Sequence, residues 1–453
     1  MKAKTADLTV GSLPKQILFF SLPLIASNLL QVLFHMSDLA VVGTFSAAGS
    51  AALGSVGSTA TLIHLFNGFL MGLGCGVNVL VANYFGADNR EQLRKTVHTA
   101  LFICAAIGLA VLAVGVLFAR NLLELLNTKE DLIEGAILYM RIYFLGMPAL
   151  ALYNFGNAVF SAVGNTKRPL VYLFSSGILN VLLNLLFVIG FQMDVAGVAW
   201  ASVISQYLSA ALILGALFHS KDVYGLHLSE LCPDLVSAKQ ILSIGLPAGL
   251  QNAIFQIANL FIQTGVNSFD TVMVEGNSAA ANADSLVYDA MAAFYTACSS
   301  FIGQNFGAGK RERILKSYFI SLGYSFGIAA VMGGALILFG TEFLSLFTRD
   351  SAVVDAGMKR LLIMALSYPF SAFMDNSIAA SRGLGKTAVP TVIVILGSCV
   401  FRVVWIYTVF AYFHTIPSLY LLYIFSWTLT AVAEILYFAH LYRKQFSKRE
   451  IAL

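Results

Sequence analysis

Twelve long apolar runs constrain what this chain can fold into more than any other feature of its sequence. A helix needs about 20 consecutive, mainly apolar residues to cross the hydrocarbon core of a bilayer. The runs lie at residues 14–40, 51–82, 93–119, 132–158, 168–190, 195–219, 239–266, 279–304, 314–340, 353–380, 388–412 and 417–442. The chain is 58% hydrophobic and only 11% charged, whereas ordinary soluble proteins are about 25% charged. We therefore predict an all-α integral membrane protein with twelve transmembrane helices.

The second half of the chain repeats the first. The tetrapeptide KQIL at residues 15–18, followed by Pro23, recurs at residues 239–242, followed by Pro247, at an offset of 224. Further matches follow at an offset of 221: FGA at 85–87 and 306–308, Pro148 and Pro369, Gly164 and Gly385, Pro169 and Pro390. Because each half holds an even number of runs, both halves enter the membrane from the same side, as parallel repeats do. The sequence therefore predicts two pseudo-symmetric six-helix bundles.

The repeat and the basic residues together predict the domains and the orientation. We expect an N-terminal lobe over residues 1–219, a cytoplasmic linker over 220–238 and a C-terminal lobe over 239–453. Twenty of the 27 Lys and Arg residues fall on the side of the membrane that holds the N-terminus, and such an excess marks the cytoplasmic side. The expectation is a multi-pass protein of the cytoplasmic (inner) membrane with both termini in the cytoplasm. Residues 1–16 lack the apolar core of a removable signal peptide.

The sequence lacks the spacings of catalytic and metal sites. The five cysteines show no CxxC or Cys/His spacing, and the seven histidines form no HExxH motif. GLGKT at residues 383–387 ends like a phosphate-binding loop, but Ala380 takes the place of the glycine that such a loop requires. We therefore expect no enzyme, no metal, no cofactor and no nucleic-acid partner. A membrane-embedded enzyme is the rival class, and it would need an acid–base or metal constellation.

The run at residues 18–43 combines a proline, Pro23, with a carboxylate, Asp38. An aspartate at the centre of a transmembrane helix costs about 2.5 to 3.5 kcal/mol, so it normally faces a cavity, a partner or an ion path. Pro23 removes a backbone N–H and clashes with the preceding turn, so it is a candidate hinge. The alternative for Asp38 is a position in the headgroup region, at the outer end of its helix.

Other polar side chains lie inside the remaining runs. Asn180 and Asn184 are four residues apart and share one helix face, and Ser202 lies several residues inside the next run. The two asparagines are candidates either for ion binding or for hydrogen bonds between helices. The second half carries a larger polar set: Gln251, Asn252, Gln256, Asp284, Asp289, Asp375, Arg402 and Glu434. Arg402 is the only base at mid-membrane, and we expect it to pair with an acid of this half because buried charges are normally paired.

Three motifs in this arrangement resemble the multidrug and toxic compound extrusion (MATE) family of bacterial efflux transporters. They are MSDLAVVG at residues 36–43, GNTKRP at 164–169 and GQNFGAG at 303–309. The resemblance implies a V-shaped pair of six-helix bundles that alternates between inward-facing and outward-facing states. It further implies export of organic, often cationic and amphipathic compounds across the cytoplasmic membrane in exchange for H+ or Na+.

The same resemblance implies a cation-coupling site in the first lobe. In relatives with such a site, the acid of the first helix is joined by an Asn and an Asp on the fifth helix and a hydroxyl on the sixth. The matching residues are Asp38, Asn180, Asn184 and Ser202. Asn184 departs from the pattern, because an amide replaces the second carboxylate. Since Na+ needs several oxygen ligands to replace its water, we expect H+ more than Na+ as the coupling ion.

The resemblance is weaker in the second lobe. Other relatives carry an acid midway along the seventh helix, where Gln251, Asn252 and Gln256 are polar but uncharged. The second-lobe set, with Asp284, Asp289, Asp375 and Arg402, is therefore predicted only as a possible polar or substrate site. The expected partners are a small organic substrate, a monovalent cation and the lipid bilayer. We expect the protein to be a monomer. A flippase for lipid-linked oligosaccharides, which has a related fold, is the alternative function.

Overall fold

The computed structural model describes residues 7–46 and 50–450, and within these ranges every regular element is a helix. The first helices are α1 (Leu13–Phe45), α2 (Ser50–Gly86), α3 (Arg90–Leu117), α4 (Ala119–Leu125), α5 (Glu130–Phe144), α6 (Met147–Ala162), α7 (Lys167–Leu185), η1 (Leu186–Gly190) and α8 (Asp194–Phe218). The later ones are η2 (Leu228–Glu230), α9 (Leu235–Val266), α10 (Thr271–Gly307), α11 (Arg311–Ser345), α12 (Ser351–Gly383), α13 (Ala388–Val394), η3 (Ile395–Val400), α14 (Phe401–Trp405), η4 (Ile406–Phe410), α15 (Ala411–Phe413) and α16 (Ile416–Glu450). The ends of the two predicted lobes, residues 1–6 and 451–453, lie outside the described residues.

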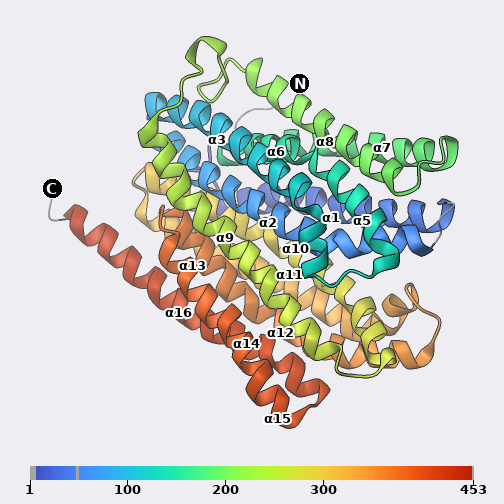
Figure 1. Cartoon of the computed structure of the whole chain (residues 1–453). Helices are drawn as coiled ribbons and strands as arrows, with labels where there is room; N and C mark the ends of the chain where they lie inside the picture. The colour runs from blue at the N-terminus through green and yellow to red at the C-terminus, as the bar shows by residue number, and fades with distance from the viewer. Residues whose placement is uncertain (1–6, 47–49, 451–453) are drawn as a thin grey trace. The chain divides into compact units, whose positions relative to one another are not determined.

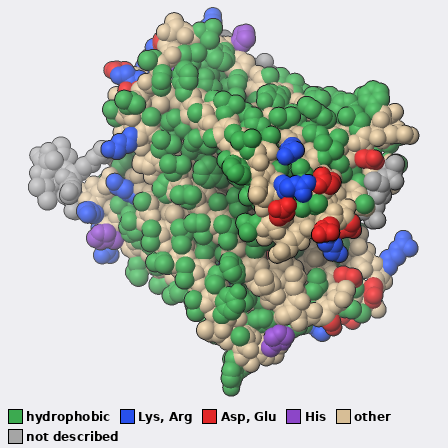
Figure 2. Space-filling view, in the orientation of Figure 1, with side chains coloured by type: hydrophobic (Ala, Val, Ile, Leu, Met, Phe, Trp, Pro, Cys, Tyr) green, Lys and Arg blue, Asp and Glu red, His purple; other side chains and the backbone are tan. Residues whose placement is uncertain are grey.

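These helices account for all twelve predicted runs. Among the described residues, nine helical spans are long and apolar enough to cross a membrane, and the bent pair α5 and α6 makes a tenth. The remaining two runs are α10 and α12, which are 37 and 33 residues long. α10 carries three acidic side chains, and α12 carries both acidic and basic ones, so their hydropathy is lower. Figure 2 shows broad areas of hydrophobic side chains on the visible face, with charged side chains gathered in a few groups. The predicted all-α membrane fold is confirmed.

Two local features differ from the uninterrupted helices that the runs predict. The run at 132–158 is broken between α5 and α6, whose axes differ by 45°. Pro148 stands in the first turn of α6 and cannot donate the hydrogen bond that would continue α5. In addition, π-helical turns interrupt the runs at 168–190 and 388–412, at η1, η3 and η4. Such turns occur frequently at functional sites.

The described chain forms two compact units, which divide it differently from the predicted lobes. Unit 1 comprises Ala26–Leu250, and unit 2 comprises Asp7–Ile25 together with the chain from Gln251 onward. Both boundaries therefore fall inside long helices, α1 and α9, two or three residues after the repeated Pro23 and Pro247. The first part of α1 thus belongs to the same unit as α10–α16. The lobes themselves, as units of transport, stay a prediction.

Hydrogen bonds in unit 2 hold the segment before α1 against the turn that joins α10 to α11. The Leu8 N–H donates to Gln304 Oε1 at 3.1 Å, and Asn305 Nδ2 donates to the Leu8 carbonyl at 3.2 Å. Lys310 Nζ donates to the Thr9 carbonyl at 2.7 Å. Gln304 and Asn305 belong to the GQNFGAG motif, which in this structure therefore anchors the start of α1.

Glycines allow α2 and α9 to approach closely within unit 1. A Cβ added at Gly72 would lie 2.4 Å from the backbone N of Gly249, and one at Gly76 would lie 2.7 Å from that of Gly245. Because real side chains never approach so closely, both positions require glycine for this helix contact. Small residues serve the same purpose in other membrane helix pairs.

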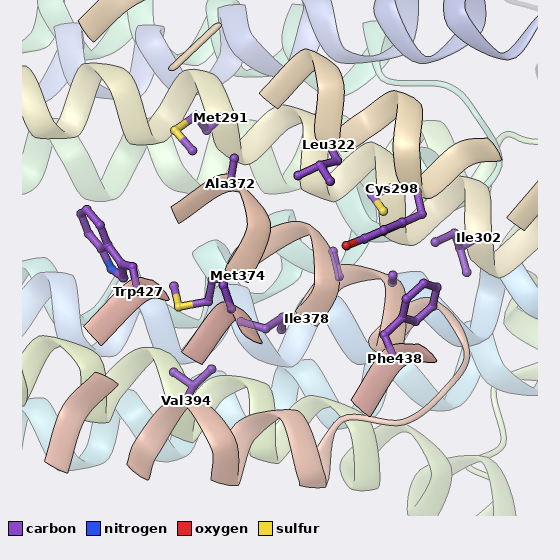
Figure 3. Packing of buried hydrophobic residues seen from close by; sticks show 14 of the residues in the cluster. Met291, Cys298, Ile302, Leu322, Ala372, Met374, Ile378, Val394, Trp427 and Phe438 are labelled. Carbon is purple, nitrogen blue, oxygen red and sulfur yellow. The ribbon is translucent and has the colours of Figure 1, made fainter. Parts of the chain in front are cut away.

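Unit 2 is built around α12, which packs against α10, α11 and α16 (Figure 1). Its largest apolar cluster includes Met291, Met374 and Trp427, contributed by α10, α12 and α16. Figure 3 shows these side chains with Val394 and Phe438 between the helices. The buried charged side chains of unit 2, Arg360, Arg402 and Glu434, lie on helices that also contribute to its apolar clusters.

Candidate functional site

In unit 1, the four residues that the sequence predicts as a cation-coupling site lie together. Asp38 comes from α1, Asn180 and Asn184 from α7, and Ser202 from α8. Asn184 Nδ2 donates to Asp38 Oδ1 at 2.5 Å, and Ser202 Oγ donates to Asp38 Oδ2 at 3.3 Å. The carboxyl group therefore has a hydrogen-bond donor on each of its two oxygens. Their role in coupling stays a prediction.

The helices themselves explain why these side chains meet. The four-residue spacing places Asn180 and Asn184 one turn apart on the same face of α7, and Asn184 Nδ2 also donates to Asn180 Oδ1 at 3.3 Å. The π-helical turn η1 begins two residues after Asn184, and it widens the helix where α7 packs against α8. Asp38 is only 7% exposed, so protein surrounds it, in contrast to the exposed headgroup position considered as its alternative.

One polar atom of this site has no partner. Asn184 Oδ1 is buried and accepts no hydrogen bond within the described residues. The cluster offers oxygens from one carboxylate, two amides and one hydroxyl, but both carboxylate oxygens already accept hydrogen bonds. Each carboxylate oxygen keeps a second lone pair that a proton can bind directly, whereas a metal cation needs several further oxygen ligands at the same time.

Two tyrosines that sequence reasoning missed adjoin this cluster. Tyr139 and Tyr143 lie one turn apart on α5, with ring centroids 5.8 Å apart, and both interact electrostatically with Asp38. In the sequence both tyrosines lie within an apolar run, where an aromatic side chain is normally interpreted as packing in the core. Their single possible signal was the i, i+4 spacing of two hydroxyl-bearing rings.

The second-half polar residues form more than one group. Asp284 forms an ion pair with Arg360 and accepts a hydrogen bond from the Tyr368 hydroxyl. Gln251 Oε1 accepts from Arg382 Nη2 at 2.9 Å. Asp375 of α12 interacts electrostatically with both Arg382 and Arg402. Asn252 and Gln256 are partly buried on α9, and Asp289 lies on α10. Arg360 and Arg382 were not predicted, because each lies near a helix end where a base normally reaches the membrane surface.

Arg402 does not form the expected ion pair. Its side chain is 0% exposed, yet within the described residues no acidic oxygen lies within 4.0 Å of it. Instead the guanidinium lies 4.6 Å from the ring centroids of both Phe255 and Tyr423, and Arg402 Nη1 donates to Asn259 Oδ1 at 3.3 Å. The prediction of a paired Arg402 is wrong because aromatic faces, which attract cations, replace the carboxylate.

Comparisons with known proteins show the family to which the chain belongs. A model of the MatE family matches the chain twice, over residues 23–186 and 247–408. YpnP, a probable multidrug resistance protein of Bacillus subtilis, is 29% identical over 382 residues, which cover 84% of this chain and 85% of that protein. NorM, a probable multidrug resistance protein of Thermotoga maritima, is 23% identical over 397 residues, covering 85% of this chain and 83% of that protein.

The fold is likewise similar to that of solved structures. A transporter of the MOP superfamily from Pyrococcus furiosus superposes with a TM-score of 0.90 at 21% identity, covering 98% of each chain. The two family matches begin at Pro23 and Pro247, so they reproduce the internal repeat that the sequence predicts. Together these findings establish that the chain belongs to the MatE family, the MATE family of membrane efflux transporters.

Proposed function

We propose that this protein is a proton-coupled antiporter that exports organic, often cationic and amphipathic compounds across the cytoplasmic membrane by alternating access. The observation that carries the proposal is the buried Asp38 cluster, a single carboxyl group surrounded by neutral donors and acceptors. Relatives named as multidrug resistance proteins support the class of substrate. In this proposal a monomer acts in the bilayer, and α1 bends near Pro23 as the two units rearrange.

The amide at position 184 favours a proton as the coupling ion. An amide group can donate a hydrogen bond through its nitrogen or accept one through its oxygen. Asn184 can therefore donate to an ionised Asp38 and, after rotation of the amide, accept from a protonated Asp38. A carboxylate at this position could not donate to Asp38, and it would add the second negative charge that a bound Na+ needs. A proton at Asp38 can therefore bind one conformation of the transporter more tightly than the other, and coupling requires such a difference.

The flippase alternative has no comparable support. The apolar runs account for twelve helices without the additional ones that such relatives commonly have, and Arg402 is enclosed by aromatic rings.

Purified protein in proteoliposomes tests the coupling ion. A pH gradient alone is expected to drive export of a fluorescent organic cation such as ethidium, while a Na+ gradient at equal pH on both sides leaves it unmoved. Transport under the Na+ gradient combined with no transport under the pH gradient would refute the proton assignment.

The substitution Asn184→Asp is expected to increase Na+ dependence. The new carboxylate restores the two-acid pattern of Na+-binding sites and adds a hard oxygen ligand of the kind that such ions prefer. The measurement is ethidium export by the variant and the wild type as Na+ is raised at constant pH. Asn180→Asp, one turn away on α7, adds the same charge to the cluster and tests whether the Na+ response depends on position 184. Equal Na+ responses of Asn184→Asp and wild type would contradict the prediction.

The proposed orientation makes Cys232 a natural probe. Cys232 lies in the linker and is exposed, whereas Cys104, Cys298 and Cys399 are buried. With the linker in the cytoplasm, a membrane-impermeant maleimide is expected to label Cys232 in inside-out vesicles and not in intact cells. Cys232→Ser provides the background signal from the other thiols. Strong labelling of Cys232 from outside intact cells would reverse the proposed topology.

A further inference from the structure

Unit 2 contains a buried carboxyl group that the proposed function does not use. Glu434 of α16 is 0% exposed, and neither of its side-chain oxygens has a hydrogen-bond partner within the described residues. Trp427 and Phe438, which share its helix face by their spacing, belong to the apolar cluster of Figure 3. Glu434 therefore points into the interior of the unit, away from lipid and water.

Charged groups of neighbouring helices surround Glu434 at a distance. Asp375 and Arg382 of α12 interact with it electrostatically, but no ion pair within 4.0 Å joins them to Glu434 within the described residues. Both groups have unsatisfied atoms as well, because Asp375 Oδ2 and Arg382 Nε are buried without partners within the described residues. Arg402 of α14 interacts electrostatically with Asp375, and its Nη2 is likewise buried without a partner there. The Tyr437 hydroxyl, on α16 itself, also interacts electrostatically with Glu434.

An ionised carboxylate in such surroundings is costly. Removing an unpaired charge from water is so unfavourable that a buried group neutralises itself or acquires a partner. Within the described residues no donor contacts Glu434, and Arg382 acts on its negative charge only from beyond hydrogen-bond distance, so binding a proton is the chemically simplest solution. A metal cation is a poorer occupant, because the guanidinium group of Arg382 would repel it.

The internal repeat indicates that the fold itself does not need these charges. At the offset of 221, Arg382 corresponds to Ser161 and Asp375 to Asn154. Glu434 falls on Ile213 at the same offset, and on the neighbouring Leu212 at the offset of 222 that separates the starts of α8 and α16. Ile213 is 0% exposed and packs in the core of unit 1. An aliphatic side chain therefore fills this position in the matching helix, and the charges in unit 2 call for a role beyond packing.

We propose that Glu434 is a second proton-binding carboxyl group, located in unit 2, which takes up and releases a proton during the transport cycle. Neutral Glu434 leaves Arg382 and Arg402 facing the single acid Asp375, whereas ionised Glu434 balances the two bases with two acids. The protonation state of Glu434 thus sets the net charge at the interface of α12, α14 and α16. The proposal rests on proton-coupled transport, but proton binding by Glu434 can be measured independently of transport.

Infrared difference spectroscopy across a pH titration tests proton binding directly. Purified wild-type protein in lipid is expected to show a carbonyl band of a protonated carboxylic acid that diminishes as the pH rises. Glu434→Gln should lose this contribution, Glu434→Asp should retain a shifted one, and Asp38→Asn should leave it unchanged. If the pH-dependent carboxyl bands of Glu434→Gln and the wild type are identical, the proposal is overturned.

Transport measurements test the exchange of this proton. In proteoliposomes, Glu434→Gln is expected to lower the number of protons moved per substrate, and Glu434→Asp to restore it. Glu434→Ile, which copies the matching position of unit 1, should lose the same proton without loss of thermal stability. An unchanged proton-to-substrate ratio in both neutral variants would overturn the proposal. Persistence of pH-driven export in Asp38→Asn would instead reject the coupling role of Asp38, and the infrared result for Glu434 would stand apart from it.

Discussion

Replacement of Asp38 with asparagine is expected to abolish proton-coupled export while the protein remains folded. The amide has nearly the shape of the carboxyl group and can still form hydrogen bonds with Asn184 and Ser202, which hold Asp38 at 2.5 and 3.3 Å. It cannot bind or release a proton, so the two conformations would no longer differ in proton affinity. A ligand without that difference shifts no equilibrium, however tightly it binds.

The test compares pH-driven export of ethidium by the variant and the wild type in proteoliposomes. Thermal unfolding in detergent establishes that the variant is folded. Ser202→Ala is the matched control: it removes one long hydrogen bond of about 1 kcal/mol and keeps the carboxyl group, so coupled export should persist. Export by Asp38→Asn at the wild-type rate would show that the coupling proton binds elsewhere.

Replacement of Arg360 with methionine is expected to cause the largest loss of stability of any single substitution considered. The ion pair with Asp284 is buried, with side-chain exposures of 6% for Arg360 and 19% for Asp284. Arg360 Nη1 also donates to the Asn277 carbonyl at 2.7 Å, and its guanidinium stacks on Tyr420. Removing one partner of a buried pair leaves an uncompensated charge, at a cost of about 3 to 5 kcal/mol.

The measurement is thermal unfolding of the purified variants. A second substitution, Asp284→Asn, added to Arg360→Met removes the stranded charge and should recover much of the loss. Arg120→Met is the matched surface control, because its partner Glu134 is 74% exposed and such pairs contribute about 0 to 1 kcal/mol. Equal melting temperatures for Arg360→Met and Arg120→Met would contradict the prediction, because the buried Arg360–Asp284 pair would then contribute no more to stability than the exposed pair of Arg120.

The membrane class, the twelve runs and the repeat could all be derived from the sequence, because hydropathy and spacing are properties of the chain itself. The same holds for the pairing of Pro23 with Pro247, at which both matches to the MatE family begin. The grouping of Asp38 with Asn180, Asn184 and Ser202 came from resemblance to a family, since no local pattern connects α1 with α7 and α8. The structure brings the four together.

Only the tertiary structure decided which buried charges meet. The sequence pointed to Arg402 and an acid as partners, yet Arg402 lies between aromatic rings while Asp284 pairs with Arg360. Partner choice depends on the rotation of each helix about its axis and on how α10, α12 and α16 pack, and neither can be read from a linear pattern. For the same reason only the structure shows that no donor reaches Glu434 within the described residues. Hydropathy records that an acid lies in a membrane helix, but it does not record which groups contact that acid.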